Sequence, residues 1–347
     1  MMTAAWMFLV ACTGITLEEE GKELPDGPLA IVATTDYSVG AIAAVSLDDW
    51  TIFDSIRVSG GDPMVVVEDG VLYQANRSGG DSVRLYPRLD EAPTLEVPLT
   101  DGANAQDIAI INDEAFVTQY DLAEMASFNI KSGLSGDEVE LLSYAESDDG
   151  LPEMVDIIVV DGLLYVGLQR LKRLEEWVSY EGRIVAIDPA SHQVVDEWVV
   201  GPNPRIFAHP WQSHSLVVLT GLWDETVGAF SVLDLGTGEI TDLATEADLG
   251  VHLSLYGEDA HGHALLVGGD IEGEHKLFCW DWASLTMTTA LSTSAYLRDL
   301  QVNSRGEAYL AIRGWNASDD ESGVMVFDVA ACTELTDEWL SFELPPY

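Results

Sequence analysis

Arginine is the residue type in this sequence best suited to bind a ligand. The chain contains 15 lysine and arginine residues against 60 aspartate and glutamate residues, and its formal net charge is −45. A guanidinium group makes forked, charge-assisted hydrogen bonds to carboxylate, sulfate or sugar-acid groups. Seven of the basic residues recur beside short apolar segments: Arg77, Arg170, Lys172, Arg173, Arg205, Arg298 and Arg313.

Acidic and aromatic residues occur near the same segments. Asp107 or Glu153 could act as a general base beside an arginine that polarises a carbonyl group, as the hydrolysis of a lactone requires. Trp315 would add an aromatic surface. The structural alternative is that the arginines pair with carboxylates and neutralise a crowded surface. The carboxylates available for this are Asp62, Asp107, Glu153 and Asp299.

Metal and cofactor chemistry has little support in the sequence. Four histidines, His209, His214, His261 and His263, could hold zinc or copper, but they lie in short turns where solvated histidine is expected. The motifs of serine hydrolases, zinc proteases, phosphate loops and dinucleotide folds are absent. We therefore predict no metal and no cofactor, and we favour a non-enzymatic role without excluding catalysis.

Short β-strands in a repeating unit must position these residues. The clearest unit, residues 154–202, has an apolar run, a turn at Asp161-Gly162, a second strand and two further strands. Asp-Gly between two apolar runs is a strong hairpin signal, because a type I′ turn needs positive φ at both central residues. Weaker copies turn at Asp69-Gly70 and Asn112-Asp113.

The repeat predicts the fold class. A period of about 40 to 50 residues with four strands per unit is typical of a β-propeller blade, and closing the ring hides the edges of the sheets. We predict an all-β protein, a β-propeller of seven blades with four antiparallel strands each. The units are expected to start near Leu29, Asp62, Ala103, Leu151, Pro202, Val251 and Tyr296.

The first unit lacks an innermost strand, because residues 29–35 have the character of a second strand. Three sources could complete the ring. The segment Glu338 to Leu344 could supply the strand, the N-terminal tether could supply it, or the ring could have six blades with the extra strands packed elsewhere.

The chain from residue 29 onward resembles the bacterial repeat propellers of the YVTN or YncE-like type, many of which are exported or lipid-anchored. The resemblance rests on the segments 161–166 (DGLLYV), 185–188 (VAID) and 201–204 (GPNP). It implies a propeller fold and a periplasmic or surface location. It implies no particular chemistry, because this fold serves many functions.

In a propeller, the turns that enter the innermost strands and the loops between second and third strands gather on one face, around the central funnel. This plan places all seven recurring basic residues on that face. We predict a ligand-binding site there, made of Arg77, Arg170, Arg205, Arg298, Arg313, Asp107, Glu153 and Trp315.

The charge of the chain excludes some partners. Nucleic acids and anionic membrane surfaces both need clustered lysine and arginine on the protein that binds them, so neither is an expected partner. Hydrophobic residues make up 47% of the chain, which is enough to bury a sizeable core.

The N-terminal residues predict where in the cell the protein is located. Residues 1–11 are expected to form a signal peptide, and Leu9-Val10-Ala11-Cys12 resembles the lipobox of bacterial lipoproteins, which implies lipidation of Cys12. The acidic residues 12–28 would form a tether, and 29–347 a single propeller domain. The alternative is an apolar N-terminus with a chance cysteine. The predicted location is the bacterial cell envelope, on the periplasmic or the outer surface, with the lipid as the only membrane contact.

The two remaining cysteines, Cys279 and Cys332, are predicted to be buried free thiols. An exported protein would also permit a disulfide between them.

The first functional hypothesis is a monomeric, non-catalytic binding module. Through its funnel face it would bind a small anionic ligand or another envelope protein. One alternative is a lactonase-like hydrolase that uses a carboxylate and an arginine of the channel. The other is an inert scaffold for envelope protein complexes.

Overall fold

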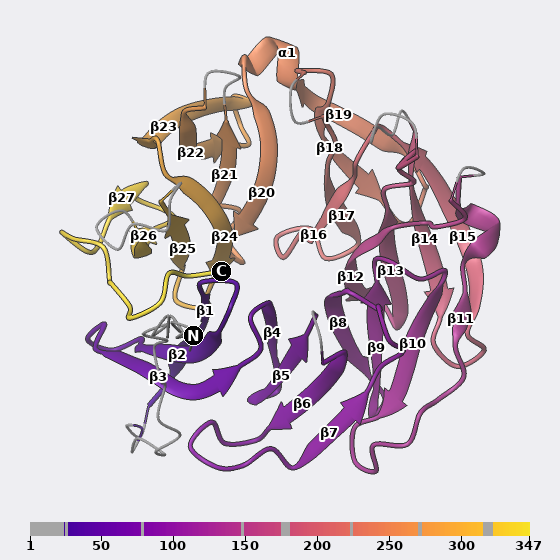
Figure 1. The fold of residues 1–347 in the computed structure, drawn as a ribbon. Coiled ribbons are helices and arrows are strands. Elements are labelled where there is room, and N and C mark those ends of the chain that lie inside the picture. The colour runs from indigo at the N-terminus through magenta and orange to yellow at the C-terminus, as the bar shows by residue number, and fades with distance from the viewer. Residues whose placement is uncertain are drawn as a thin grey trace, which may run out of the picture.

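The chain folds into a ring of seven β-sheets. The computed structural model describes residues 24, 27–77, 80–146, 149–174, 181–222, 225–269, 273–314 and 322–347. The sheets are arranged radially around a central axis (Figure 1), and the strands within each sheet are antiparallel neighbours. The predicted seven-bladed β-propeller is therefore confirmed. No helix in the described ranges combines the length and the apolar character needed to cross a membrane.

The first four blades follow one another in chain order. Blade 1 contains β1 (Leu29–Thr35), β2 (Gly40–Ser46) and β3 (Ile52–Ser59). Blade 2 contains β4 (Pro63–Glu68), β5 (Val71–Asn76), β6 (Ser82–Tyr86) and β7 (Leu95–Pro98). Blade 3 contains β8 (Ala105–Ile111), β9 (Glu114–Gln119), β10 (Glu124–Asn129) and β11 (Val139–Glu140). Blade 4 contains β12 (Met154–Val160), β13 (Leu163–Leu168), β14 (Gly182–Asp188) and β15 (Gln193–Val200).

The last three blades complete the ring. Blade 5 contains β16 (Arg205–Ala208), β17 (Ser215–Leu219), β18 (Ala229–Asp234) and β19 (Ile240–Thr245). Blade 6 contains β20 (His252–Glu258), β21 (Ala264–Gly269), β22 (His275–Asp281) and β23 (Thr286–Thr293). Blade 7 contains β24 (Tyr296–Val302), β25 (Glu307–Arg313), β26 (Gly323–Asp328) and β27 (Thr333–Glu334). A 3-10 turn (Leu142–Tyr144) and α1 (Glu246–Leu249) are the helical elements of the described chain.

The hairpin turns between first and second strands have the predicted geometry. Asp161 and Gly162 have φ values of 50° and 83°. Both residues also have positive φ in the equivalent turns Asp69-Gly70 and Asn112-Asp113. These are the backbone signs of a type I′ turn, which matches the twist of the strands it connects.

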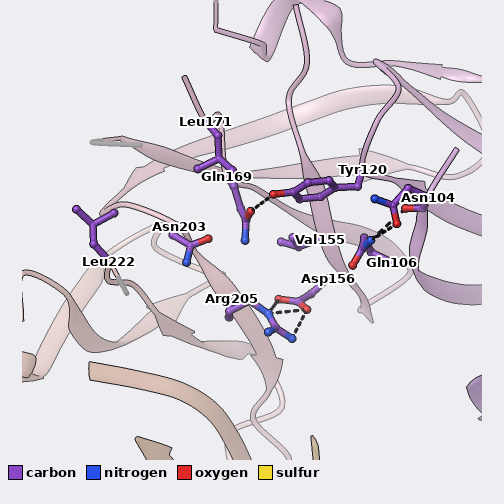
Figure 2. A pocket seen from close by; sticks show the side chains of 10 residues that line it. All are labelled: Asn104, Gln106, Tyr120, Val155, Asp156, Gln169, Leu171, Asn203, Arg205 and Leu222. Atoms are coloured by element: carbon purple, nitrogen blue, oxygen red, sulfur yellow. Dashed lines mark hydrogen bonds and ion pairs between the residues drawn. The ribbon is translucent and has the colours of Figure 1, made fainter. Parts of the chain in front are cut away.

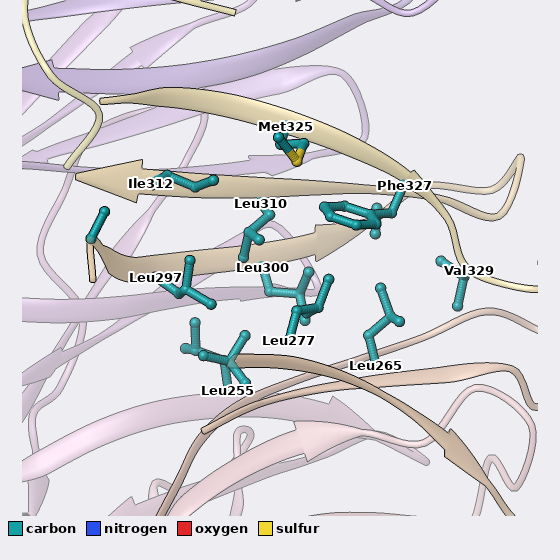
Figure 3. Close-up of a cluster of buried hydrophobic side chains, with 13 residues drawn as sticks. Leu255, Leu265, Leu277, Leu297, Leu300, Leu310, Ile312, Met325, Phe327 and Val329 are labelled. Carbon is teal, nitrogen blue, oxygen red and sulfur yellow. The ribbon is translucent and has the colours of Figure 1, made fainter. Parts of the chain in front are cut away.

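The core is divided into clusters that lie between neighbouring blades. Figure 3 shows the cluster in which Leu255 and Leu277 of blade 6 pack against Leu297, Leu310 and Phe327 of blade 7. Comparable clusters fill the other six interfaces between blades. Because no blade buries its apolar face alone, each blade depends on both neighbours.

The ring is closed by the C-terminal residues. β1 pairs with β2 on one side, and on the other side Thr34 forms an antiparallel bridge with Pro346. The backbone N–H of Tyr347 donates to the carbonyl of Ala33 at 2.8 Å. A short C-terminal segment, residues 345–347, thus forms the fourth strand of blade 1.

This closure corrects two of the sequence-based alternatives. The segment Glu338 to Leu344 does not line β1, because Leu340 already exchanges backbone hydrogen bonds with Val324 of β26 in blade 7. The closing residues begin directly after that segment. A six-bladed ring is also wrong, since seven blades are present.

The cysteine prediction was wrong as well. Cys279 of β22 and Cys332 form a disulfide, with their Cα atoms 6.0 Å apart. The two residues are separated by 53 positions, about one repeat. Neighbouring blades therefore bring them within bonding distance, so that the disulfide joins blade 6 to blade 7.

Candidate functional site

Bulges in the inner strands set the direction of the side chains near the ring axis. In β8 the pairing with β9 skips between Ala105 and Ile108, and in β12 the pairing with β13 skips between Met154 and Ile157. Similar shifts leave Ser254 of β20 and Arg298 of β24 without a partner in the ladder. A β-bulge inserts one extra residue and re-aims its side chain, often beside a functional site.

Charged side chains converge on Arg205, the first residue of β16. Asp156, in the bulge of β12, accepts hydrogen bonds from Arg205 Nε and forms an ion pair with Nη2 at 2.9 Å (Figure 2). Asp299 and Asp107 also act electrostatically on Arg205, from blades 7 and 3. Carboxylates from three blades therefore surround a single guanidinium group.

Asp107 has a strongly altered acidity. Its two carboxylate oxygens accept hydrogen bonds from the backbone N–H groups of Ile108 and Ile157 at 2.8 and 3.0 Å. Burial raises the pKa of Asp107 to about 7, and the negative charge of Asp156 contributes in the same direction. The N–H donors and Arg205 oppose this increase. Asp107 therefore gains and loses a proton near neutral pH.

Beside Arg205 lies a cavity of about 500 Å³, which we call the polar pocket. It opens on the face of the ring where the inner strands begin and the second strands end. Its size falls within the range typical of small-molecule sites. The lining residues, drawn in Figure 2, are Asn104, Gln106, Tyr120, Val155, Asp156, Gln169, Leu171, Asn203, Arg205 and Leu222.

Four carboxamide side chains dominate the pocket, and the orientation of one is fixed by Tyr120. The Tyr120 hydroxyl donates to Gln169 Oε1 at 2.9 Å. Burial raises the pKa of Tyr120 to about 12, so the hydroxyl keeps its proton. Arg173 lies over the Tyr120 ring at 4.6 Å and holds it in place. Gln169 Nε2 therefore remains as a donor that points into the pocket (Figure 2).

The other carboxamide side chains differ in how much of their hydrogen-bonding capacity is used. Gln106 donates to Asn104 Oδ1 at 2.9 Å and accepts from Arg77 at 3.3 Å. Asn104 in turn donates to Asp121 at 2.8 Å. No hydrogen bond joins the side chain of Asn203 to another described residue, although it borders the pocket. The pocket thus offers unused amide donors and acceptors on the side formed by Gln169 and Asn203.

Glu153 lies away from the pocket surface. Its side chain is fully buried, accepts from the backbone N–H of Leu171 at 2.8 Å and forms an ion pair with Arg173 Nε at 2.9 Å. Burial raises the pKa of Glu153 to about 8, against the effect of these two donors. Glu153 and Arg173 thus hold the loop that presents Leu171 to the pocket.

Arg170 also has a supporting position. It forms ion pairs with Glu146 at 2.7 Å and Glu181 at 2.9 Å, and its Nε donates to the carbonyl of Tyr144. These contacts fix the loops at the outer part of the same face. Of the predicted site residues that the structure describes, only Arg205 directly lines the polar pocket.

The other predicted arginines form a second group, the arginine–tyrosine cluster, which consists of Tyr37, Arg77, Arg298, Arg313 and Tyr347. Arg77 and Arg298 lie over the Tyr347 ring at 4.5 and 5.6 Å from its centroid. Arg313 lies over the Tyr37 ring at 4.5 Å. Arg77 connects the cluster to the polar pocket through its hydrogen bond to Gln106. Trp315, the remaining predicted residue, lies outside the described residues.

The four histidines on the opposite face do not converge. His209 pairs with Glu258, His214 with Asp161 and His263 with Asp259. Within the described ranges, no three histidine, cysteine or acidic side chains are grouped in a way that could hold a metal ion.

Sequence reasoning missed the amide lining of the pocket, Asp156 and Tyr347. A signal was available for Gln169: it directly follows a buried second strand, and carboxamides close the equivalent strands of the two preceding blades at Asn76 and Gln119. The position of Tyr347 depends on ring closure, which no local pattern indicates.

Comparison with known proteins supports the fold, but it shows neither a family nor a function. No family model matches the chain, and no curated protein matches it. Among solved structures it is similar to a "putative 6-phosphogluconolactonase" from Bacteroides uniformis, with 12% identity, a TM-score of 0.65, and coverage of 91% of this chain and 96% of that one.

Two further solved structures are similar to the chain in fold. One is the Cps50 (Swd1) β-propeller domain of Myceliophteria thermophila, with 11% identity, a TM-score of 0.59, and coverage of 84% of this chain and 94% of that one. The other comes from a nidogen/laminin complex, with 12% identity, a TM-score of 0.53, and coverage of 92% and 97%. The chain is thus a seven-bladed β-propeller, a class whose members have unrelated functions.

Proposed function

We propose that this protein is a non-catalytic binding module whose polar pocket takes a small, polyhydroxylated ligand such as a sugar. The observation that carries the proposal is the pair of amides, Gln169 and Asn203, that border the pocket with hydrogen-bonding capacity not used by the described residues. Hydroxyl groups both donate and accept, as carboxamides do, so the two match well.

The electrostatics of the pocket favour an uncharged ligand body. The one guanidinium group in the lining, Arg205, is already neutralised by Asp156 in a two-oxygen contact. Val155, Leu171 and Leu222 supply apolar surface for the carbon face of such a ligand. A few placed polar groups on a partly apolar wall are typical of specific small-molecule sites.

The test is binding to a glycan array, followed by calorimetry with the sugar that binds best. Gln169→Ala should weaken binding about tenfold or more, because it removes a donor with a fixed orientation. Gln212→Ala is the matched control, since Gln212 is exposed and distant from the pocket. An array with no hits, or equal affinity in both variants, would reject the pocket as the site and favour an inert scaffold.

We further propose that the protein is exported and anchored through a lipid on Cys12 in a bacterial envelope, as expected from the lipobox resemblance. The Cys279–Cys332 disulfide supports export, because such bonds persist in oxidising compartments. Metabolic labelling with a palmitate analogue should mark the wild-type protein and not Cys12→Ser. Equal labelling would contradict the anchor.

A lactonase activity is the second candidate. It is favoured by Asp107, a carboxylate beside Arg205 with a pKa of about 7, which suits a general base at neutral pH. The likeness to the Bacteroides protein agrees with this candidate at the level of fold. A panel of sugar lactones should then show turnover that Asp107→Asn abolishes. No turnover by the wild-type protein across the panel removes this candidate.

A further inference from the structure

The arginine–tyrosine cluster gathers three guanidinium groups where blades 7, 1 and 2 meet. Arg298 comes from the bulge of β24, Arg313 from the end of β25 and Arg77 from the loop after β5. They come close together because Tyr347, in the closing strand, lies beneath both Arg77 and Arg298. The cluster thus exists only in the closed ring.

Positive charge in this cluster exceeds the negative charge paired with it. Arg77 forms an ion pair with Asp62 at 2.6 Å. Arg313 is only 6% exposed, donates to the carbonyl of Pro346 at 3.2 Å and has no ion pair with a described carboxylate. Arg298 is exposed and likewise has no ion pair with any residue in the described ranges. Asp36 is the further carboxylate that acts on Arg313 from a distance.

This pattern is unusual for the molecule. Most described arginines elsewhere in the chain contact a carboxylate directly, as Arg84, Arg183 and Arg305 do. Burial lowers the pKa of Arg313, and repulsion between Arg313 and Arg298 contributes in the same direction. In a protein with a net charge of −45, carboxylates to neutralise these groups are abundant. Among the carboxylates that the structure describes, none pairs with Arg298, which distinguishes it from most of the other described arginines.

We propose that the arginine–tyrosine cluster is a binding site for an oxyanion, a phosphate or carboxylate group carried by a small molecule. Arg298 presents an unpaired guanidinium fork to the anion, and Arg313 and Arg77 supply the surrounding positive field. Guanidinium groups bind such anions through two parallel hydrogen bonds. The tyrosine rings hold the arginines in place by cation–π contacts, which reduces the ordering needed on binding.

This site goes beyond the proposed function, because its residues lie outside the lining of the polar pocket. It is nonetheless connected to that pocket, since Arg77 donates to Gln106. The two sites can be tested separately, because Gln169→Ala removes only a pocket contact and Arg298→Ala only a cluster contact.

The test is calorimetric titration of the full chain with sodium phosphate and, separately, with sodium acetate, at pH 7 and constant ionic strength. We expect at least one anion to bind, and Arg298→Ala to weaken that binding about tenfold or more. Arg298→Lys keeps the charge and loses the fork, so it should give an intermediate affinity. Preference for phosphate or for acetate identifies the anionic group of the ligand.

Arg88→Ala is the matched control. Arg88 is exposed and pairs with Asp90 and Glu91 in a distant turn, so its loss should leave anion binding unchanged. Arg298 makes no hydrogen bond with the described chain, and its replacement should leave the melting temperature close to the wild-type value. The site is overturned if neither anion binds, or if Arg298→Ala and Arg88→Ala have equal effects.

Discussion

Individual charged side chains near the axis of the ring form ion pairs with specific partners. Asp156 is bound to Arg205, Glu153 to Arg173, and Asp62 to Arg77. Removing one member of such a pair leaves a charge without compensation, whereas exposed pairs elsewhere contribute little. The residues best placed to bind a ligand are therefore those whose hydrogen-bonding or charge-pairing capacity is not used by the described residues. These are Gln169, Asn203 and Arg298, together with Asp107.

Asp107 should make stability depend on pH. The folded protein keeps a proton on Asp107 up to about pH 7, whereas the unfolded chain loses it near pH 4. The folded state therefore binds more protons in this window, and the free energy of unfolding falls as the pH rises from about 4 to about 7. Asp107→Asn should reduce this slope in urea unfolding measured across the range.

The control for this prediction is Asp101→Asn, which removes one acidic residue from an exposed turn. It replaces the same residue type by asparagine and should leave the slope close to that of the wild-type protein. Identical slopes for Asp107→Asn and the wild type would contradict the raised pKa.

A second residue-level prediction concerns the buried pair of His209 and Glu258. Their side chains are fully buried, with Nδ1 and Oε2 2.6 Å apart. His209 Nε2 and Glu258 Oε1 have no hydrogen-bond partner among the residues that the structure describes. Glu258→Leu alone should cost about 1–3 kcal/mol, because it leaves the histidine unsatisfied. The double variant with His209→Phe should recover much of that loss, since apolar residues can replace a buried pair. Urea unfolding of the three variants measures both effects, and a double variant less stable than the single one would contradict this account.

At the scale of strands and turns, local sequence was a sound guide. Type I′ turns at Asp161-Gly162 and Asp69-Gly70 and the seven-fold repeat follow from residue types and spacing, because the turn needs positive φ and a blade needs four strands. The bulges that aim Asp156 and Arg298 could not be predicted. A single extra residue alters the alternation of side chains without leaving a signal in composition.

Close approach of backbone segments at the start of β18 gives an element-level prediction. A Cβ atom on Gly228 would clash with the carbonyl oxygen of Thr220, and the Gly228 N–H donates to buried Glu246 at 2.8 Å. Gly228→Ala must therefore separate the strands locally and should cost at least about 2 kcal/mol in urea unfolding. Gly27→Ala, whose Cβ atom would lie 3.6 Å from the side chain of Asp48, should be neutral to within about 0.5 kcal/mol. Equal stability of the two variants would show that the strands move apart without cost.

At the scale of the whole molecule, the contacts that close the ring could not be predicted from the sequence. Each blade packs on two neighbours, so the first and last blades must meet over a long chain separation. The pairing of Thr34 with Pro346 is a consequence of that meeting, and the disulfide between Cys279 and Cys332 depends likewise on the packing of two neighbouring blades, 6 and 7. Neither leaves a local pattern, and for this reason the thiol prediction was wrong and the position of Tyr347 was missed.

Reducing the disulfide should destabilise the ring. A loop of 53 residues corresponds to about 4 kcal/mol of loop-closure entropy, and measured effects of about 2–4 kcal/mol are usual. Thermal unfolding with and without dithiothreitol should show this loss in the wild-type protein. The variant with both Cys279→Ser and Cys332→Ser should already be less stable and should not respond to dithiothreitol. A wild-type protein that is equally stable when reduced would show that packing alone holds blades 6 and 7.

The surplus residue in four of the inner strands has a consequence for how such a protein diversifies. Two of these residues, Ser254 and Arg298, occupy positions that the hydrogen-bond ladder does not require, whereas Asp107 and Asp156 accept hydrogen bonds from neighbouring blades. Exchanging Ser254 and Arg298 can alter recognition while the hydrophobic interfaces stay intact. Libraries randomised at these sites should therefore yield folded variants with new specificities, which makes the ring a convenient starting point for directed evolution.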